Sequence, residues 1–401
     1  MHRLLRSFAA LLLVGAAVPA LATNGMRMTG FGAVQNSMGG VGTALTLDSS
    51  TIVSNPAGLS DLTRRLDVSA TWFVPTVDYS AVGAAPGVVL NNTTQTSNKG
   101  GSLIPTLGLV LPLGAGFTTG LGVFAMAGMG VDYDPNIFAS PLVTSYQQLR
   151  VAPAVSWKTG AFSAGLALNL AWAQMAYDAA SAVGNPDHKA TSATGYGATL
   201  GVKFALIKTL SLGLSYETKT TFQDFEFDIG APAKDALKFD QPAVLAGGVS
   251  WQAATPLLLA LDVEWIQWSA TNGKDQPEYQ PGSPSAAGGL AFNMDWSDQV
   301  VLKVGAEYTI NPSWKVRAGY NYGKNPLNAD QAFESIAFPA IAEHHVSAGL
   351  GWAVTDTLAI NVAGTYSPKS TQSGANLNQG IVSYTTSMSQ YALDLGVGWH
   401  F

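Results

Sequence analysis

Residue types that commonly carry catalysis or bind metals are few in this chain and lie far apart. Cysteine is absent, which excludes a disulfide framework, a thiol nucleophile and a cysteine metal site. The five histidines are His2, His188, His344, His345 and His400. Their spacing shows no Ser/His/Asp set, although distant residues can assemble one. We therefore expect no cofactor and no metal, and catalysis remains an alternative rather than the leading interpretation.

Charged residues offer a second kind of chemistry. Several stand at alternate positions within apolar segments, where a β-strand would turn them to one face: Arg150, Asp262, Glu264, Lys303, Glu307, Lys315 and Arg317. Acidic and basic members are nearly balanced, which favours an internal ion-pair network. If a carboxylate ligand binds there instead, Arg150, Lys303 and Arg317 are the candidates.

Strands must position these residues, and the last one is the clearest. In residues 391–401, every odd position is large and apolar while the even positions are small or polar. A half-buried strand of a soluble protein can alternate in this way. Membrane strands also do so, with apolar residues toward lipid and polar residues toward the lumen.

The same alternation recurs in about fourteen segments, an even number as in bacterial single-chain barrels. They begin near residues 66, 103, 117, 146, 161, 194, 209, 239, 256, 299, 313, 343, 357 and 389. Short connections alternate with long ones, and the long ones cover residues 81–102, 129–145, 179–193, 221–238, 269–298, 324–342 and 368–388. Short periplasmic turns and long external loops are typical of a transmembrane barrel, whereas a soluble sandwich has no reason to sort its loops.

Composition and the N-terminus fit a secreted membrane protein. Hydrophobic residues make up 47% of the chain and charged residues only 11%. Residues 1–22 have the basic, apolar and small-residue regions of a signal peptide, with cleavage expected after Ala22. Loss of Arg3 and Arg6 changes the formal net charge from −6 to −8, which argues against a nucleic-acid partner.

Residues 23–65 do not alternate, and we interpret them as a compact segment before a barrel of residues 66–401. Asp48 or Ser49 is expected to cap a short helix that ends at Asn55-Pro56, since a residue before proline is disfavoured in a helix. Asn55-Pro56-Ala57 could also be an ordinary turn before the first strand.

The order of a glycine-rich segment, Asn55-Pro56-Ala57, a first strand, residues 339–349 and an aromatic C-terminal strand resembles the outer-membrane family that transports long-chain fatty acids and aromatic hydrocarbons (the FadL/TodX type, OMPP1). The resemblance covers the whole mature chain. It implies an all-β, fourteen-stranded antiparallel barrel in a Gram-negative outer membrane. An N-terminal hatch would close the lumen, and ligands would leave sideways beside a kinked strand.

Further site residues follow from this resemblance. The third segment carries the candidates for the kink, Gly120, Gly122 and Gly128, although glycine is abundant throughout. Apolar ligand contacts are expected from Met26, Met28, Phe31, Met38, Phe222 and Phe225. The first four could simply fill the barrel, and the two phenylalanines could belong to the outer aromatic girdle.

The resemblance predicts passive uptake of hydrophobic compounds, with long-chain fatty acids first and toluene-like hydrocarbons as the alternative. A general porin and a lipid-acting enzyme are weaker alternatives, because the chain has few charges and no legible catalytic set. Expected partners are hydrophobic small molecules, outer-membrane lipid and, through Phe401, the barrel assembly machinery. We expect a monomer.

Overall fold

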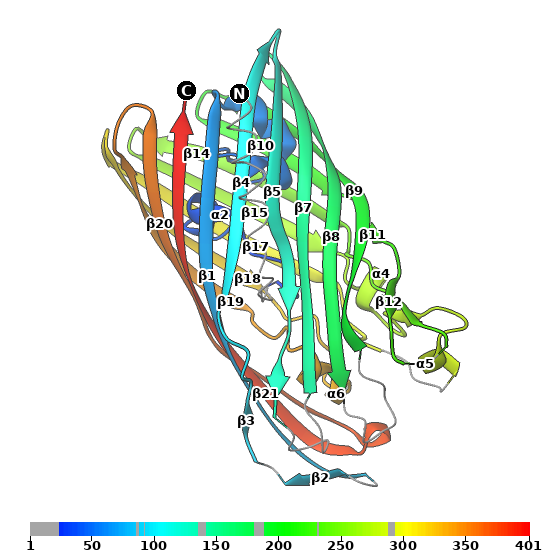
Figure 1. The fold of residues 1–401 in the computed structure, drawn as a ribbon. Helices are drawn as coiled ribbons and strands as arrows, with labels where there is room; N and C mark the ends of the chain where they lie inside the picture. Colours follow the sequence, from blue (N-terminus) through cyan, green and yellow to red (C-terminus); the bar gives the residue numbers. More distant parts are fainter. Residues whose placement is uncertain are drawn as a thin grey trace.

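A closed barrel forms the body of the protein. The computed structural model describes residues 24–85, 88–91, 93–134, 142–179, 188–230, 232–287 and 293–401. Fourteen long antiparallel strands form the wall (Figure 1), and the last strand, β21, pairs with the first, β1, from Arg65↔His400 to Gly83↔Ile381. Closure leaves the sheet with no terminal edge strand. The predicted fold, a fourteen-stranded antiparallel barrel with an N-terminal hatch, is confirmed.

The wall strands follow one another around the barrel in chain order. They are β1 (Arg65–Ala85), β4 (Ser102–Gly114), β5 (Phe117–Met129), β7 (Leu142–Thr159), β8 (Phe162–Ala179), β9 (His188–Ile207), β10 (Leu210–Glu217), β14 (Val244–Ala254), β15 (Leu257–Ile266), β17 (Gln299–Asn311), β18 (Trp314–Gly323), β19 (His344–Ala353), β20 (Leu358–Asn376) and β21 (Ile381–His400).

Most strands begin within a residue or so of the predicted position, and the differences lie at the outer ends. The strands β7, β9 and β21 begin earlier than predicted. Where a strand extends beyond the bilayer, neither of its faces meets lipid. These extensions therefore lack the apolar alternation on which the prediction relied. Strand β14 begins later, at Val244, because Pro242 cannot donate a ladder hydrogen bond.

Exposure along the wall follows the alternation. On β21, Leu393 and Leu395 are 58% and 56% exposed, whereas Asp394 between them is fully buried. The exposed leucines face outward, and the buried aspartate faces the lumen. The wall therefore presents apolar side chains to lipid and keeps its charges inside.

The N-terminal hatch, residues 24–64, lies inside the barrel near the end where β1 begins and β21 ends (Figure 1). Its elements are α2 (Gly32–Asn36), α3 (Thr51–Ser54) and the 3₁₀ helix η1 (Pro56–Asp61). Helix α2 packs on β1, β19, β20 and β21, and η1 packs on β5, β7, β8 and β9. The hatch therefore touches wall strands on both sides of the lumen.

Helix α3 ends as predicted but begins differently. Its N-cap is Ser50, whose side chain makes no capping hydrogen bond. Asp48 instead accepts a hydrogen bond from the Ser50 backbone N–H at 3.0 Å. The C-cap is Asn55, which is extended, and Pro56 then opens η1.

Shorter elements connect the outer ends of the strands. These are β2 (Val88–Asn91), β3 (Gln95–Thr96), β6 (Asp132–Tyr133), β11 (Thr221–Phe222), η3 (Leu377–Gln379), the helices α4 (Ser269–Asn272), α5 (Pro284–Ala287) and α6 (Ala332–Ala337), and a separate three-stranded sheet of β12 (Phe225–Phe227), β13 (Asp235–Lys238) and β16 (Glu278–Tyr279). Among the described residues, no helix has the length and apolarity needed to cross a membrane. The expected signal peptide, residues 1–22, lies outside the described residues.

Candidate functional site

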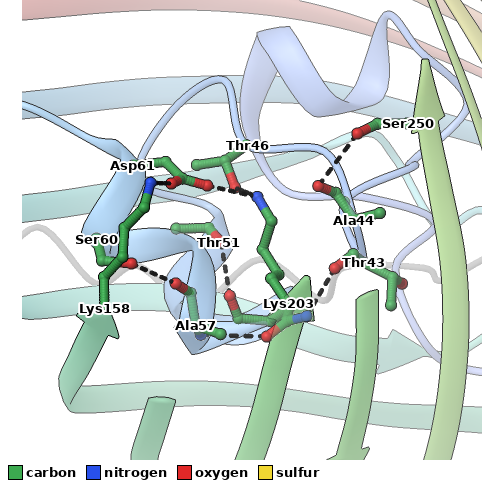
Figure 2. Close-up of polar contacts among 12 residues, drawn as sticks. Thr43, Ala44, Thr46, Thr51, Ala57, Ser60, Asp61, Lys158, Lys203 and Ser250 are labelled. Carbon is green, nitrogen blue, oxygen red and sulfur yellow. Dashed lines mark hydrogen bonds and ion pairs between the residues drawn. The ribbon is translucent and has the colours of Figure 1, made fainter. Parts of the chain in front are cut away.

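Asn55-Pro56-Ala57 is seated against the barrel wall. Asn55 is fully buried, and its Nδ2 donates to Thr43 O at 2.6 Å within the hatch and to Val202 O at 3.2 Å on β9. Its Oδ1 accepts from the Ala57 backbone N–H at 3.1 Å. The asparagine therefore joins two hatch segments to the wall, which an isolated turn before β1 would not do. Figure 2 shows the surrounding polar contacts of Thr43 and Ala57.

Glycines in the wall make this close approach possible. A Cβ at Gly201 on β9 would overlap Asn55 Oδ1, and a Cβ at Gly165 on β8 would overlap the backbone of Pro56 and Ala57. Inward glycines on other strands would also clash with hatch atoms: Gly108, Gly213, Gly305, Gly319 and Gly349. Much of the glycine in this sequence thus lines the seat of the hatch.

Ion pairs close to the start of β1 reinforce this seat. Asp61 at the end of η1 binds Lys158 Nζ of β7 at 2.6 Å and Lys203 Nζ of β9 at 2.7 Å (Figure 2). Lys203 also donates to Thr46 Oγ1 at 2.8 Å. Burial acts to raise the pKa of Asp61, but Lys203 and Lys158 outweigh it and hold that pKa below its ordinary value.

Luminal carboxylates of the wall bind the hatch backbone and side chains. Asp262 on β15 accepts from the backbone N–H groups of Gly42 at 2.7 Å and Thr43 at 2.9 Å. Asp394 on β21 accepts from Asn36 Nδ2 at 2.7 Å. These contacts fix α2 and the loop after it from opposite sides of the barrel.

The luminal cations predicted from parity do face the lumen, and each has an acidic partner. Lys303 binds Glu264 Oε1 at 2.6 Å and also donates to Thr29 O of the hatch at 3.0 Å. Arg317 binds Glu307 Oε2 at 2.7 Å, and its Nη1 donates to Asn361 Oδ1 at 2.9 Å. Both ion pairs lie within the wall, and Lys303 adds a hydrogen bond to the hatch.

Arg150 on β7 differs from the other two. It is fully buried, and its Nη2 lies 2.5 Å from Glu217 Oε1 of β10. Glu217 also binds Arg27 of the hatch at 2.9 Å. The Nε and Nη1 atoms of Arg150 have no hydrogen-bond partner among the described residues. Sequence reasoning selected Arg150 but missed Glu217, which ends a strand and has no pattern of its own.

Apolar side chains fill the outer half of the lumen. A single buried cluster joins wall residues to the outer loops, and its largest members include Tyr79, Tyr133, Tyr146, Phe225, Phe227, Phe239, Trp268 and Trp296. Helix α6 contributes residues to this cluster, as do the buried Phe338 and Ile341 that follow it. Phe225 was predicted above, whereas the other loop residues among these carry no periodic signal.

The structure divides the six predicted apolar residues among three clusters. Met26, Phe222 and Phe225 belong to the outer apolar cluster, and Met28 packs against it. Phe31 packs on a second cluster around Phe124, with ring centroids 5.8 Å apart, and Met38 belongs to a third cluster between hatch and wall. Phe222 and Phe225 are at most 4% exposed, so they do not form an outer girdle facing lipid.

A small polar cavity separates the hatch from the apolar cluster. Its walls include Asn24, Arg27, Glu217, Glu264 and Lys303. Its volume, counted as the space available to the centres of water molecules, is about 30 Å³. This is enough for one or two waters but too small for a hydrophobic ligand. A ligand must therefore displace side chains or loops to occupy this part of the lumen.

Strand β5 stops pairing with β4 about halfway along its length but stays paired with β7. Its pairing with β4 ends at Thr106↔Phe124, and its register with β7 shifts between Ala125 and Ala127. Beyond that point the hatch pairs with β5 instead: Met28 N donates to Met126 O at 3.1 Å, and Gly128 N donates to Met26 O at 3.0 Å. In Figure 1 the strand bends at this level.

The position of this irregularity depends little on the glycines. Gly120 and Gly122 lie in the regularly paired part of β5, and only Gly128 lies in the displaced part. The adjoining residue on β4 is Pro105, which has no N–H to donate to a ladder. Proline on the neighbouring strand was the signal that sequence reasoning missed.

A serine, a histidine and an aspartate do meet in the outer loops. Ser285 Oγ lies 2.5 Å from Asp235 Oδ2, and the same oxygen lies 2.8 Å from His188 Nε2. The hydroxyl donates to the carboxylate, whereas an activated serine needs its hydroxyl directed at the imidazole. The cluster instead connects β9 to β13 and α5.

Comparison with known proteins agrees with this architecture. A family model described as outer membrane protein transport protein (OMPP1/FadL/TodX) matches residues 19–399. The crystal structure of a Pseudomonas aeruginosa FadL homologue is similar with a TM-score of 0.76 and 17% identity, covering 94% of this chain and 100% of that one. The P. putida toluene transporter TodX has a TM-score of 0.73 and 18% identity, covering 93% and 99%.

One curated relative matches over a shorter stretch. It is an uncharacterized Chlorobium limicola protein from the 5′ region of a phosphoenolpyruvate carboxykinase gene, 31% identical over 101 residues. The match covers 25% of this chain and 46% of the relative, so it spans less than half of that protein. Because the barrel is closed, holds an internal hatch and matches the family over nearly its whole length, this chain belongs to the OMPP1/FadL/TodX family of outer membrane proteins that transport hydrophobic compounds.

Proposed function

We propose that this protein takes up long-chain fatty acids by passive diffusion. The acid enters through the outer loops into the apolar cluster, and its carboxylate pairs with Arg150. It then leaves sideways where β5 departs from β4. The observation that carries this proposal is the buried Arg150 guanidinium, two of whose nitrogens have no hydrogen-bond partner within the described part of the chain.

The charge around Arg150 favours an anion. Arg27 and Arg150 share the single carboxylate of Glu217, so this group carries one net positive charge. Arg150 contacts Thr220, whose backbone bridges to Gln241, and the Gln241 side chain contacts Met26 of the apolar cluster. A carboxylate at Arg150 would therefore have its alkyl chain in apolar surroundings.

A sideways exit suits such a ligand. Moving an alkyl chain into water costs ~0.8 kcal/mol per CH₂, on the order of 10 kcal/mol for about a dozen of them. An exit from the cluster into the bilayer avoids this cost. Arg150 pairs with Phe124 in the β5–β7 ladder, and Phe124 is also the last β5 residue paired with β4. The polar group is thus at the level where the wall pairing stops.

A toluene-like hydrocarbon is the alternative ligand. The aromatic side chains of the outer cluster would suit it, and the similar TodX structure is described as that of a toluene transporter. A neutral ligand would gain nothing from the positive charge at Arg150. The two ligands therefore predict different effects of removing that charge.

The test is uptake of labelled oleate and labelled toluene by cells that lack their own transporter. We expect oleate uptake on expression of the protein. Losing a charge-assisted hydrogen bond costs about 2 kcal/mol, so Arg150→Gln should weaken oleate affinity roughly 30-fold. Arg317→Gln is the matched control, because Arg317 is a buried luminal arginine that already binds Glu307 and Asn361. Toluene uptake alone, insensitive to Arg150→Gln, would assign the protein to hydrocarbons.

We further propose the segment roles and partners expected from the sequence: a signal peptide in residues 1–22, a hatch from residue 23 to the start of the barrel, and a monomeric barrel that contacts outer-membrane lipid. Phe401 is half exposed, with its ring 4.9 Å from that of Trp399. This exposure supports a role of the terminal aromatic in recognition by the assembly machinery. Poor membrane assembly of a chain lacking Phe401 would be the expected result.

A further inference from the structure

Strands β4 and β5 do not pair with each other along one stretch, which is bounded at both ends. Its inner end is the Thr106↔Phe124 pair. Its outer end is a backbone hydrogen bond from Asn98 N to Asp132 O at 2.7 Å. Seven residues lie between these contacts on either chain, residues 99–105 and 125–131, a length of roughly 20 Å of strand. We call this stretch the wall gap.

The segment that closes the outer end, residues 97–99, is called the strap. Ser97 N donates to Val77 O of β1 at 2.8 Å, and Ser97 Oγ accepts from Asp132 N at 3.0 Å. Lys99 Nζ donates to Thr144 O of β7 at 3.0 Å. A Cβ at Gly130 would clash with that same carbonyl and would crowd the Lys99 ammonium. The strap thus connects β1 to β6 and β7 across the gap.

Thr144 also contacts the apolar cluster. Its Oγ1 accepts from Val131 N at 3.1 Å and donates to Ala337 O of α6 at 2.7 Å. Ala337 and the next residue, Phe338, are buried in the outer cluster. One threonine therefore joins the strap, the displaced end of β5 and helix α6 of the outer cluster.

The closed strap holds a partly desolvated charge. Burial lowers the pKa of Lys99 to about 8, although the nearby Asp132 acts to raise it. Release of the strap would return this ammonium to water.

We propose that the strap is a ligand-operated closure of the wall gap: a hydrophobic acid entering the apolar cluster displaces α6, breaks the Thr144–Ala337 hydrogen bond and releases the strap from β6 and β7. This inference rests on the proposed function and adds the element that controls it. Without bound ligand, the strap closes the outer end of the wall gap, while Met26 and Met28 of the hatch pair with β5 further in.

A disulfide across the strap tests the proposal. The chain has no native cysteine, so Asn98→Cys with Asp132→Cys introduces one pair. The backbone hydrogen bond from Asn98 N to Asp132 O brings the two Cα atoms close enough for a disulfide, which spans about 4.4–6.8 Å between Cα atoms. The matched control is Ser373→Cys with Thr385→Cys, which are paired on β20 and β21 with their hydroxyls 2.9 Å apart. A short bismaleimide can join either pair if oxidation is incomplete.

We expect the joined strap to lower oleate uptake at least tenfold, with recovery after reduction of the disulfide, while the joined control transports at the wild-type rate. In purified protein, oleate should slow disulfide formation at the strap severalfold, and Thr144→Val should abolish that slowing. Equal uptake with the strap joined and free would overturn the inference. Wild-type and control proteins that take up neither oleate nor toluene would instead refute the proposed function.

Discussion

Gly201→Ala tests whether the hatch is seated as tightly as the contacts indicate. The added Cβ would overlap Asn55 Oδ1 and lie 3.1 Å from Pro56 Cδ. Overpacking of an interior costs about 1–3 kcal/mol, and a buried Asn55 that loses a hydrogen bond adds about 1–3 kcal/mol. A total on the order of 3 kcal/mol would raise the ratio of unseated to seated hatch by roughly 150-fold.

Ion conductance in planar bilayers is the assay, because a displaced hatch opens the lumen to water. Wild-type protein should conduct small ions poorly, whereas a porin would show a large steady conductance. Gly201→Ala should add frequent open events. Gly247→Ala is the control, because a Cβ there meets nothing within 4 Å. Resistance of the hatch to added protease is a second measurement. If the two alanine variants have the same conductance and the same protease resistance, the seat does not depend on this contact and our reasoning is wrong.

Three more predictions concern the hatch and the apolar cluster. Asp61→Asn should loosen the hatch at neutral pH. Because Lys203 and Lys158 hold the pKa of Asp61 below its ordinary value, the stabilisation by native Asp61 should be complete above about pH 5 and disappear as the pH falls through the folded pKa. A conductance titration that is identical for native and variant protein would contradict this. Asn55→Ala with Pro56→Ala should impair uptake at equal surface expression, and unchanged uptake would make the motif an ordinary turn. Phe225→Ala should destabilise the outer cluster by about 3–5 kcal/mol, measured as a lower temperature of the heat-induced mobility shift, whereas Leu377→Ala, at a site 75% exposed, should leave that temperature unchanged.

Local pattern was enough to predict the barrel. Lipid outside and a polar lumen inside impose alternation on every wall strand, and short turns between long loops give the strand number and the direction of the chain. Parity along the strands also placed Arg150, Lys303 and Arg317 in the lumen, as the structure shows. Each of these inferences depends on residues that are neighbours in sequence.

Features that depend on distant residues were not accessible in this way. Glu217, the partner of Arg150, lies three strands away, and only closure of the barrel brings the two across the lumen. The break in the β4–β5 ladder occurs beside Pro105 and not at Gly120 or Gly122, because pairing depends on both strands and the hatch supplies the replacement partner for β5.

The sequence by itself determined a membrane barrel, its inward-facing charges and a separate N-terminal segment, since period-two alternation is a local response to two different solvents. Only the tertiary structure decided how the hatch is held, which cation retains unpaired donors and where the wall pairing stops. Those properties arise from contacts between segments far apart in the chain. The loops and hatch that make such contacts have no repeating environment, so no repeating pattern records them.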